Sequence, residues 1–149
     1  MERRSSAFRD PARIDAALLA ELAAFFAQVP AWDFTLAETA RFPGVLYLAP
    51  QPALPFQRLI TGLAARYPDA PPYGGAFPGG VVPHCTVAHA AHVTEITPLD
   101  AVASAVAASL PIPARAHKAW LMTKGASCRW GQAARSALAG DGSPRPAAP

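Results

Sequence analysis

The sequence predicts an α+β fold in which an antiparallel sheet carries helices on one face. Three observations favour this class: the predicted strands outnumber the predicted helices, several neighbouring strands are close enough in sequence to pair antiparallel, and each predicted helix has an apolar face for a sheet to cover. With 149 residues, the chain has the length of one compact domain or of two small lobes that share a core, which excludes a large multidomain enzyme.

The first predicted helix spans residues 10–29. Asp10 is suited to the N-cap and Pro11 to the first helical position, and Pro30 ends the segment. An apolar face runs along the segment because hydrophobic residues recur at helical spacing. These residues are Ile14, Leu18, Leu22, Phe25, Phe26 and Val29.

A β-hairpin is predicted after this helix. Trp32, Phe34 and Leu36 alternate with other residues, which is typical of a half-buried strand, and residues 45–48 form a continuous apolar run suited to a central strand. The turn is expected around residues 41–44, which include a Pro-Gly pair.

The middle of the chain predicts a helix over residues 52–67, a loop rich in proline and glycine over 71–80, and a strand over 81–88. A third helix is expected to open at Thr97, where Pro98 and Asp100 complete a capping pattern. The residues expected to face inward from it are Leu99, Val102, Val106 and Leu110.

Two final strands are expected over residues 116–123 and 129–136, so that the folded domain covers residues 10–138. Residues 1–9 and 139–149 are predicted to be disordered tails, because their composition cannot bury enough surface to offset the entropy of ordering.

Charge and cysteine content narrow the range of partners. The formal net charge is +3, and the basic residues are scattered singly, so duplex DNA is not expected as a partner. Cys85 and Cys128 are expected to be reduced, inert thiols. No secretion signal or membrane-spanning run is visible, so a cytoplasmic location and no membrane partner are expected.

The strongest chemical signal is the segment around His84. Residues two apart on a strand share a face, so His84 and Thr86 are predicted to lie side by side, with Cys85 and Val87 directed into the core. The Thr86 hydroxyl could hold a phosphoryl oxygen while His84 transfers a proton. Tyr73, and with it Phe77, lies in the preceding loop and could stack on a nucleobase as part of the substrate-binding site.

Other interpretations of these residues remain open. His84 could be an ordinary strand histidine. A metal site formed by Cys85, His89 and His92 is disfavoured because the spacing matches no standard zinc pattern, so no metal and no cofactor are expected. His89, His92 and His117 are expected on the surface. Four arginines could contact phosphate without any being singled out: Arg41, Arg58, Arg66 and Arg115. The aromatic residues expected in the core are Trp32, Phe34, Tyr47 and Trp120.

The segments 41–50, 71–77 and 81–88, in this order, resemble the two-histidine (2H) phosphoesterases, and most closely the bacterial 2′-5′ RNA ligase family and cyclic phosphodiesterase-like proteins. The similarity covers about residues 11–135 and includes the later strand Ala119-Trp120-Leu121-Met122. The resemblance implies two lobes of antiparallel sheet with flanking helices. Each lobe contributes a His-x-Thr or His-x-Ser motif: one histidine is the general base, the other is the general acid, and the hydroxyls hold phosphate without a metal. By this resemblance His84 and Thr86 form the second motif, and the partner is a nucleotide or RNA terminus with a 2′,3′-cyclic phosphate or a 2′-5′ linkage.

One departure from the family pattern affects the expected activity. The family's first motif precedes the first helix, where this chain has only residues 1–9. The other His-x-Thr sequence of the chain, His92-Val93-Thr94, follows the same strand as His84, so it is not expected to supply the motif of the opposite lobe. The first lobe is therefore expected to be incomplete, as in a chain truncated at its start, with activity weakened or lost and with an exposed sheet edge that favours self-association. The alternatives are a non-catalytic module that binds nucleotides or RNA ends and a remnant that does neither.

Overall fold

A computed structural model of the chain describes residues 13–77, 79–90, 97–124 and 129–140. The described residues divide into two compact units. The first unit comprises residues up to Trp32, the segment Asp69–Gly74 and the residues from Arg115 onward; the second comprises Asp33–Pro68 and Gly75–Ala114. Helices combine with antiparallel strand pairs, which confirms the predicted α+β class.

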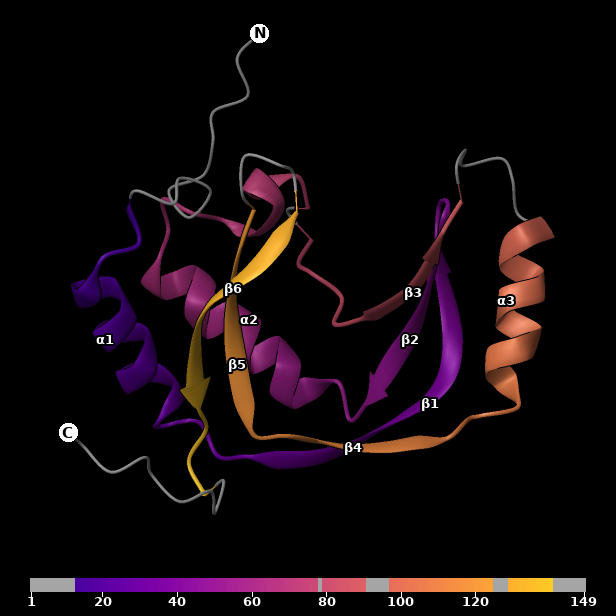
Figure 1. Cartoon of the computed structure of the whole chain (residues 1–149), viewed down its shortest axis with the longest axis horizontal. Helices are drawn as coiled ribbons and strands as arrows, with labels where there is room; N and C mark the ends of the chain where they lie inside the picture. Colours follow the sequence, from indigo (N-terminus) through magenta and orange to yellow (C-terminus); the bar gives the residue numbers. More distant parts are fainter. Residues whose placement is uncertain (1–12, 78, 91–96, 125–128, 141–149) are drawn as a thin grey trace, which may run out of the picture. The chain divides into compact units, whose positions relative to one another are not determined.

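The first unit is built from helix α1 (Ala16–Phe26) and strands β5 (Lys118–Lys124) and β6 (Trp130–Ala137). Helix α1 packs against β6 (Figure 1) and buries Leu22 and Phe26. The predicted start of this helix at Asp10 is wrong, because Asp15 is the N-cap and its side chain accepts a hydrogen bond from the Leu18 amide at 2.8 Å. Asp10 and Pro11 lie outside the described residues.

Strands β5 and β6 form a two-stranded antiparallel sheet. Along β5 the side chains alternate between exposed and half-buried, as expected of a sheet with one covered face. Trp120 is on the exposed face, with 43% of its surface accessible. The prediction that it belongs to the core is therefore wrong, because the tryptophan occupies the uncovered side of the strand.

The end of β6 is joined to the end of α1 by backbone hydrogen bonds. Ala31 donates to the Ala139 carbonyl and Ala139 donates to the Val29 carbonyl, each at 2.8 Å. Leu138 is buried at this junction. Ala139, placed in the predicted tail, is thus bonded into the first unit, whereas residues 141–149 and 1–12 lie outside the described residues.

The second unit contains a four-stranded sheet in the order β3-β2-β1-β4 (Figure 1). Its strands are β1 (Trp32–Phe42), β2 (Val45–Gln51), β3 (Cys85–His89) and β4 (Ile112–Ala116). The predicted hairpin is confirmed, with Gly44 in the left-handed region at φ 70° in the turn. The predicted central position of residues 45–48 is confirmed too, and Leu46 is fully buried.

Strand β4 was not predicted. It pairs with β1 at the edge of the sheet, which is where the ladder tolerates a residue without an N–H, such as Pro113. Its short sequence, Ile-Pro-Ala-Arg-Ala, has little of the β-branched and aromatic content that identifies a strand.

Two helices complete the second unit. Helix α3 (Thr97–Ala107) packs against β2 and β3 and buries Leu99. Helix α2 (Leu54–Arg66) contacts β1 through Phe56, whose ring meets that of Phe34 edge to face at 4.9 Å. In the described part of the chain, no helix is long and apolar enough to cross a membrane.

Candidate functional site: a histidine and a threonine on the face of an edge strand

The candidate site lies on β3, the edge strand of the four-stranded sheet. β3 begins at Cys85 rather than at the predicted residue 81. Pro83, which has no amide hydrogen to donate to the neighbouring strand, precedes it. His84 therefore lies just before the regular ladder, and its position depends on its neighbours as well as on strand pairing.

The register of β2 and β3 determines which side chains share a face. Thr86 lies directly opposite Tyr47, and side chains of directly opposed residues project from the same face of a sheet. His84, two residues before Thr86, is brought to this face as well, since its ring contacts the Tyr47 ring. The structure thus brings the two predicted site residues together on one face.

Two aromatic rings hold the His84 imidazole. The rings of Phe42 and Tyr47 are stacked with centroids 4.3 Å apart. The imidazole meets both edge on, at 5.2 Å from Phe42 and 5.6 Å from Tyr47. Edge-to-face contacts of this kind are favourable because the positive edge of one ring meets the negative face of another. His84 is half-buried as a result.

A hydrogen bond fixes which nitrogen of His84 carries the proton. Nδ1 lies 2.7 Å from the carbonyl oxygen of Val82, and a carbonyl can only accept, so Nδ1–H is the donor. In the neutral ring, Nε2 then has a free lone pair and can accept a proton; in the charged ring it can donate one. The backbone hydrogen bond thus leaves Nε2 as the ring nitrogen available to a ligand.

Thr86 and Cys85 are both exposed. Exposure of the Thr86 hydroxyl suits contact with a ligand. For Cys85 the prediction of a core position is wrong. Cys85 lies opposite Leu48 and so points to the other face of the sheet, but it begins an edge strand and its side chain is exposed there.

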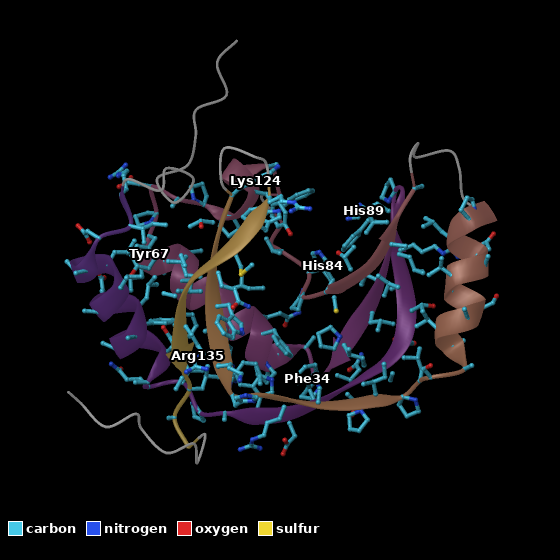
Figure 2. The ribbon with its side chains drawn as sticks, viewed as in Figure 1. Phe34, Tyr67, His84, His89, Lys124 and Arg135 are labelled. Carbon is cyan, nitrogen blue, oxygen red and sulfur yellow. The ribbon has the colours of Figure 1, made fainter. Side chains whose placement is uncertain are left out.

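A bulge in β3 brings a second histidine to the same face. Leu46 pairs with Ala88 and Tyr47 with Thr86, so Val87 is an extra residue in the ladder. His89 consequently lies opposite Val45, which shares a face with Tyr47. Without the bulge, the alternation of side chains along β3 would place His89 on the same face of the sheet as Cys85. Figure 2 shows His84 and His89 on the same side of β3, turned away from α3.

This second histidine was missed as a site residue. His89 was predicted only to be on the surface, and it is exposed. The available signal was the spacing His-x-Thr-x-x-His, which places both histidines on the face of Thr86 only when one residue between them is bulged.

The opposite face of the sheet is occupied by α3. Arg41, which pairs with Leu46 across the hairpin, forms an ion pair with Asp100 of α3, with Nη2 and Oδ1 2.5 Å apart. Arg41 therefore projects away from the face that carries His84. Of the other three candidate arginines, Arg58 and Arg66 lie on α2, and Arg115 lies near the end of β4, where the chain passes from the second unit to the first.

The remaining candidates are distributed between the units. Tyr73 belongs to the first unit and Phe77 to the second, and both side chains are more than half exposed. His117 belongs to the first unit, where Nδ1–H donates to the Arg115 carbonyl at 3.3 Å. His92 lies outside the described residues. Within the described ranges, no group of three His, Cys, Asp or Glu side chains could hold a metal ion.

A histidine and a threonine two residues apart on one face of an antiparallel sheet form an arrangement compatible with the 2H phosphoesterase class. Residues 6–127 match the family model described as the 2′-5′ RNA ligase superfamily. The chain belongs to this family. No match was found among curated proteins, and none among solved structures.

Proposed function

We propose that the chain binds the phosphate of a 2′,3′-cyclic nucleotide or of a 2′-5′ linked RNA end at Thr86 and hydrolyses it with His84 as the acid/base group. The observation that carries this proposal is the shared face of His84 and Thr86, on which the backbone bond from Nδ1 leaves Nε2 for proton transfer. Family membership supports a substrate of the RNA type.

The hydrolysis step follows from these two side chains. The Thr86 hydroxyl donates to a phosphoryl oxygen and orients the phosphorus. Nε2 of His84 takes a proton from a water molecule as its oxygen bonds to phosphorus. The bond from phosphorus to a ribose oxygen breaks, and this leaving oxygen receives its proton from solvent.

We propose further that this polypeptide turns its substrate over slowly. Within the described residues, His84 is the one imidazole on this face that a backbone hydrogen bond and ring contacts hold in place, whereas His89 is exposed on the same face, so no second fixed imidazole protonates the leaving oxygen. General acid or base assistance contributes about 10²–10⁴ in rate. A deficit of this order is expected relative to an enzyme that supplies both groups.

The test is hydrolysis of a 2′,3′-cyclic nucleotide by the purified chain, followed by chromatography of the products. His84→Ala should abolish turnover, Thr86→Ala should weaken binding about tenfold, since a hydrogen bond to a charged group contributes about 1.5–3 kcal/mol, and Thr86→Ser should retain binding. Cys85→Ser is the matched control, because Cys85 is an exposed neighbour on the other face. Turnover that persists in His84→Ala would refute the assignment.

A second candidate function is a binding module without turnover. The observation that favours it is that, in the described part of the chain, His84 is the one imidazole on the face of Thr86 that neighbouring groups hold in place. Calorimetric binding of adenosine 2′-phosphate, lost in Thr86→Ala and accompanied by no hydrolysis of cyclic nucleotides, would support this alternative.

A further inference from the structure

The exposed face of the β5–β6 sheet carries a concentration of tryptophan and cationic side chains, and it belongs to the first unit, whereas His84 and Thr86 belong to the second. The register aligns Trp120 with Arg135, Met122 with Gln132 and Lys124 with Trp130, so these side chains project from one face. Lys118 joins them by alternation along β5. We call this surface the tryptophan face; it consists of Lys118, Trp120, Met122, Lys124, Trp130, Gln132 and Arg135.

Large apolar side chains are unusually accessible on the tryptophan face. Trp130 is 66% exposed, Trp120 43% and Met122 40%. The opposite face has the half-buried residues Ala119, Leu121 and Thr123, and α1 packs against β6. The small core of the first unit thus uses one side of the sheet and leaves both indoles to solvent, which indicates an interaction surface rather than packing.

The charge of the tryptophan face is of one sign. Lys118, Lys124 and Arg135 contribute three cations, and the face has no carboxylate. Two of these cations lie over indole rings: Lys124 Nζ is 6.0 Å from the Trp130 ring centroid, and the Arg135 guanidinium carbon is 5.7 Å from that of Trp120. Each pair places a flat aromatic surface beside a positive charge.

We propose that the tryptophan face binds single-stranded RNA. Bases of a single strand stack on exposed aromatic rings regardless of their identity, and the phosphates between the bases pair with neighbouring cations. The proposal deepens the proposed function by giving the RNA chain a surface beyond its reacting end, and it rests on that function only for the choice of RNA as ligand.

Single-stranded RNA fits this surface better than the other occupants. Duplex RNA presents its bases stacked and paired, so it could use the cations but not the indoles. A second copy of this face would bring its three cations against three like charges, which opposes dimerisation. Charge complementarity therefore favours a polyanion with accessible aromatic rings.

The test is fluorescence anisotropy with a labelled oligouridylate about ten nucleotides long, which matches the reach of such sites. The oligonucleotide ends in free hydroxyls, so it lacks the cyclic phosphate for which His84 and Thr86 are proposed. Trp120→Ala and Trp130→Ala should each weaken binding on the order of tenfold. Lys124→Ala should lower the slope of log K against log salt by about 0.7.

Matched controls come from the second unit. Leu54→Ala removes an apolar side chain that is 51% exposed, and Arg58→Ala removes an exposed cation; neither should change the affinity. All variants should keep the melting temperature within a few degrees, because the substituted side chains are exposed.

Three results would overturn the proposal: unchanged affinity in both tryptophan variants, equal affinity for a duplex of the same length, or a concentration-dependent dimer that Trp130→Ala dissociates while RNA binding is unaffected. The last result would identify a second copy as the occupant. The two proposals can be distinguished by their variants. His84→Ala should lose cyclic-nucleotide hydrolysis and keep oligouridylate binding, whereas the tryptophan variants should lose oligouridylate binding and keep cyclic-nucleotide hydrolysis.

Discussion

The imidazole of His84 lies edge on to the ring of Tyr47, with centroids 5.6 Å apart. Tyr47 is itself buried and is stacked on Phe42. The orientation of the His84 ring is thus set by a packed aromatic pair on the neighbouring strands as well as by the Val82 carbonyl. Under the proposed function Tyr47 is a positioning residue, because it contacts the His84 ring and not the substrate.

The first prediction concerns this positioning. Tyr47→Leu should lower kcat for a cyclic nucleotide on the order of tenfold by loosening the imidazole, with little change in KM, because Thr86 still binds the phosphate. Tyr47→Phe keeps the ring and should restore the rate. Equal losses of kcat in both variants would show that the hydroxyl, rather than the ring, is what matters.

The second prediction concerns His89. Because the bulge at Val87 brings His89 to the face of Thr86, we expect His89→Ala to weaken binding of a nucleoside carrying two phosphates about tenfold more than binding of a 2′-mononucleotide. Isothermal titration calorimetry gives both constants. His117→Ala, which removes a histidine of the first unit, is the control. An equal effect on both ligands would place His89 outside the binding surface.

The third prediction concerns the ion pair of Arg41 and Asp100. Their side chains are 38% and 59% exposed, and exposed ion pairs contribute about 0–1 kcal/mol. Arg41→Ala should therefore lower the free energy of unfolding by less than about 1 kcal/mol and leave phosphate binding unchanged. Urea denaturation, combined with Asp100→Ala in a double-mutant cycle, measures the coupling. A large loss of ligand affinity would contradict the placement of Arg41 on the α3 face.

The fourth prediction concerns the core of the second unit. Leu46 is completely buried at the centre of the sheet, so Leu46→Ala should destabilise the protein by about 2–5 kcal/mol through lost burial and a cavity. Leu54→Ala, at an exposed position, should stay within about 0.5 kcal/mol. Chemical denaturation distinguishes the two; similar values for both would mean that the sheet is not the stabilising core.

Much of the fold was predictable because the spacing of apolar residues along the sequence indicates which side chains are buried. The hairpin of β1 and β2, the central position of Leu46 and the helix α2 follow from apolar spacing and from Pro-Gly punctuation. Strand β4 was not predictable in this way, because an edge strand with proline has neither alternation nor β-branched content. The start of α1 was misplaced because Asp10 and Asp15 are both plausible caps, and the local pattern does not rank them.

The candidate site was predictable in part. That His84 and Thr86 lie on one face of the sheet follows from the two-residue period of a strand. The exposure of Cys85 and the orientation of His89 do not, since the first depends on β3 being at the sheet edge and the second on a bulge that arises from pairing with β2. Trp120 was misassigned for a related reason: alternation identifies two faces of a strand, and only the tertiary structure shows which face is covered.

The two units draw on alternating stretches of the chain, since the segment Asp69–Gly74 of the first unit interrupts the second, and the second unit separates α1 from β5 and β6. The first unit therefore cannot be excised by choosing two end points, and a fragment that contains the whole second unit also carries the segment Asp69–Gly74 of the first. A cut intended to isolate the His84 sheet would leave the first unit in unconnected pieces. Point substitutions in the intact polypeptide, or a circular permutation that rejoins the segments, are the ways to study one unit without destroying the other.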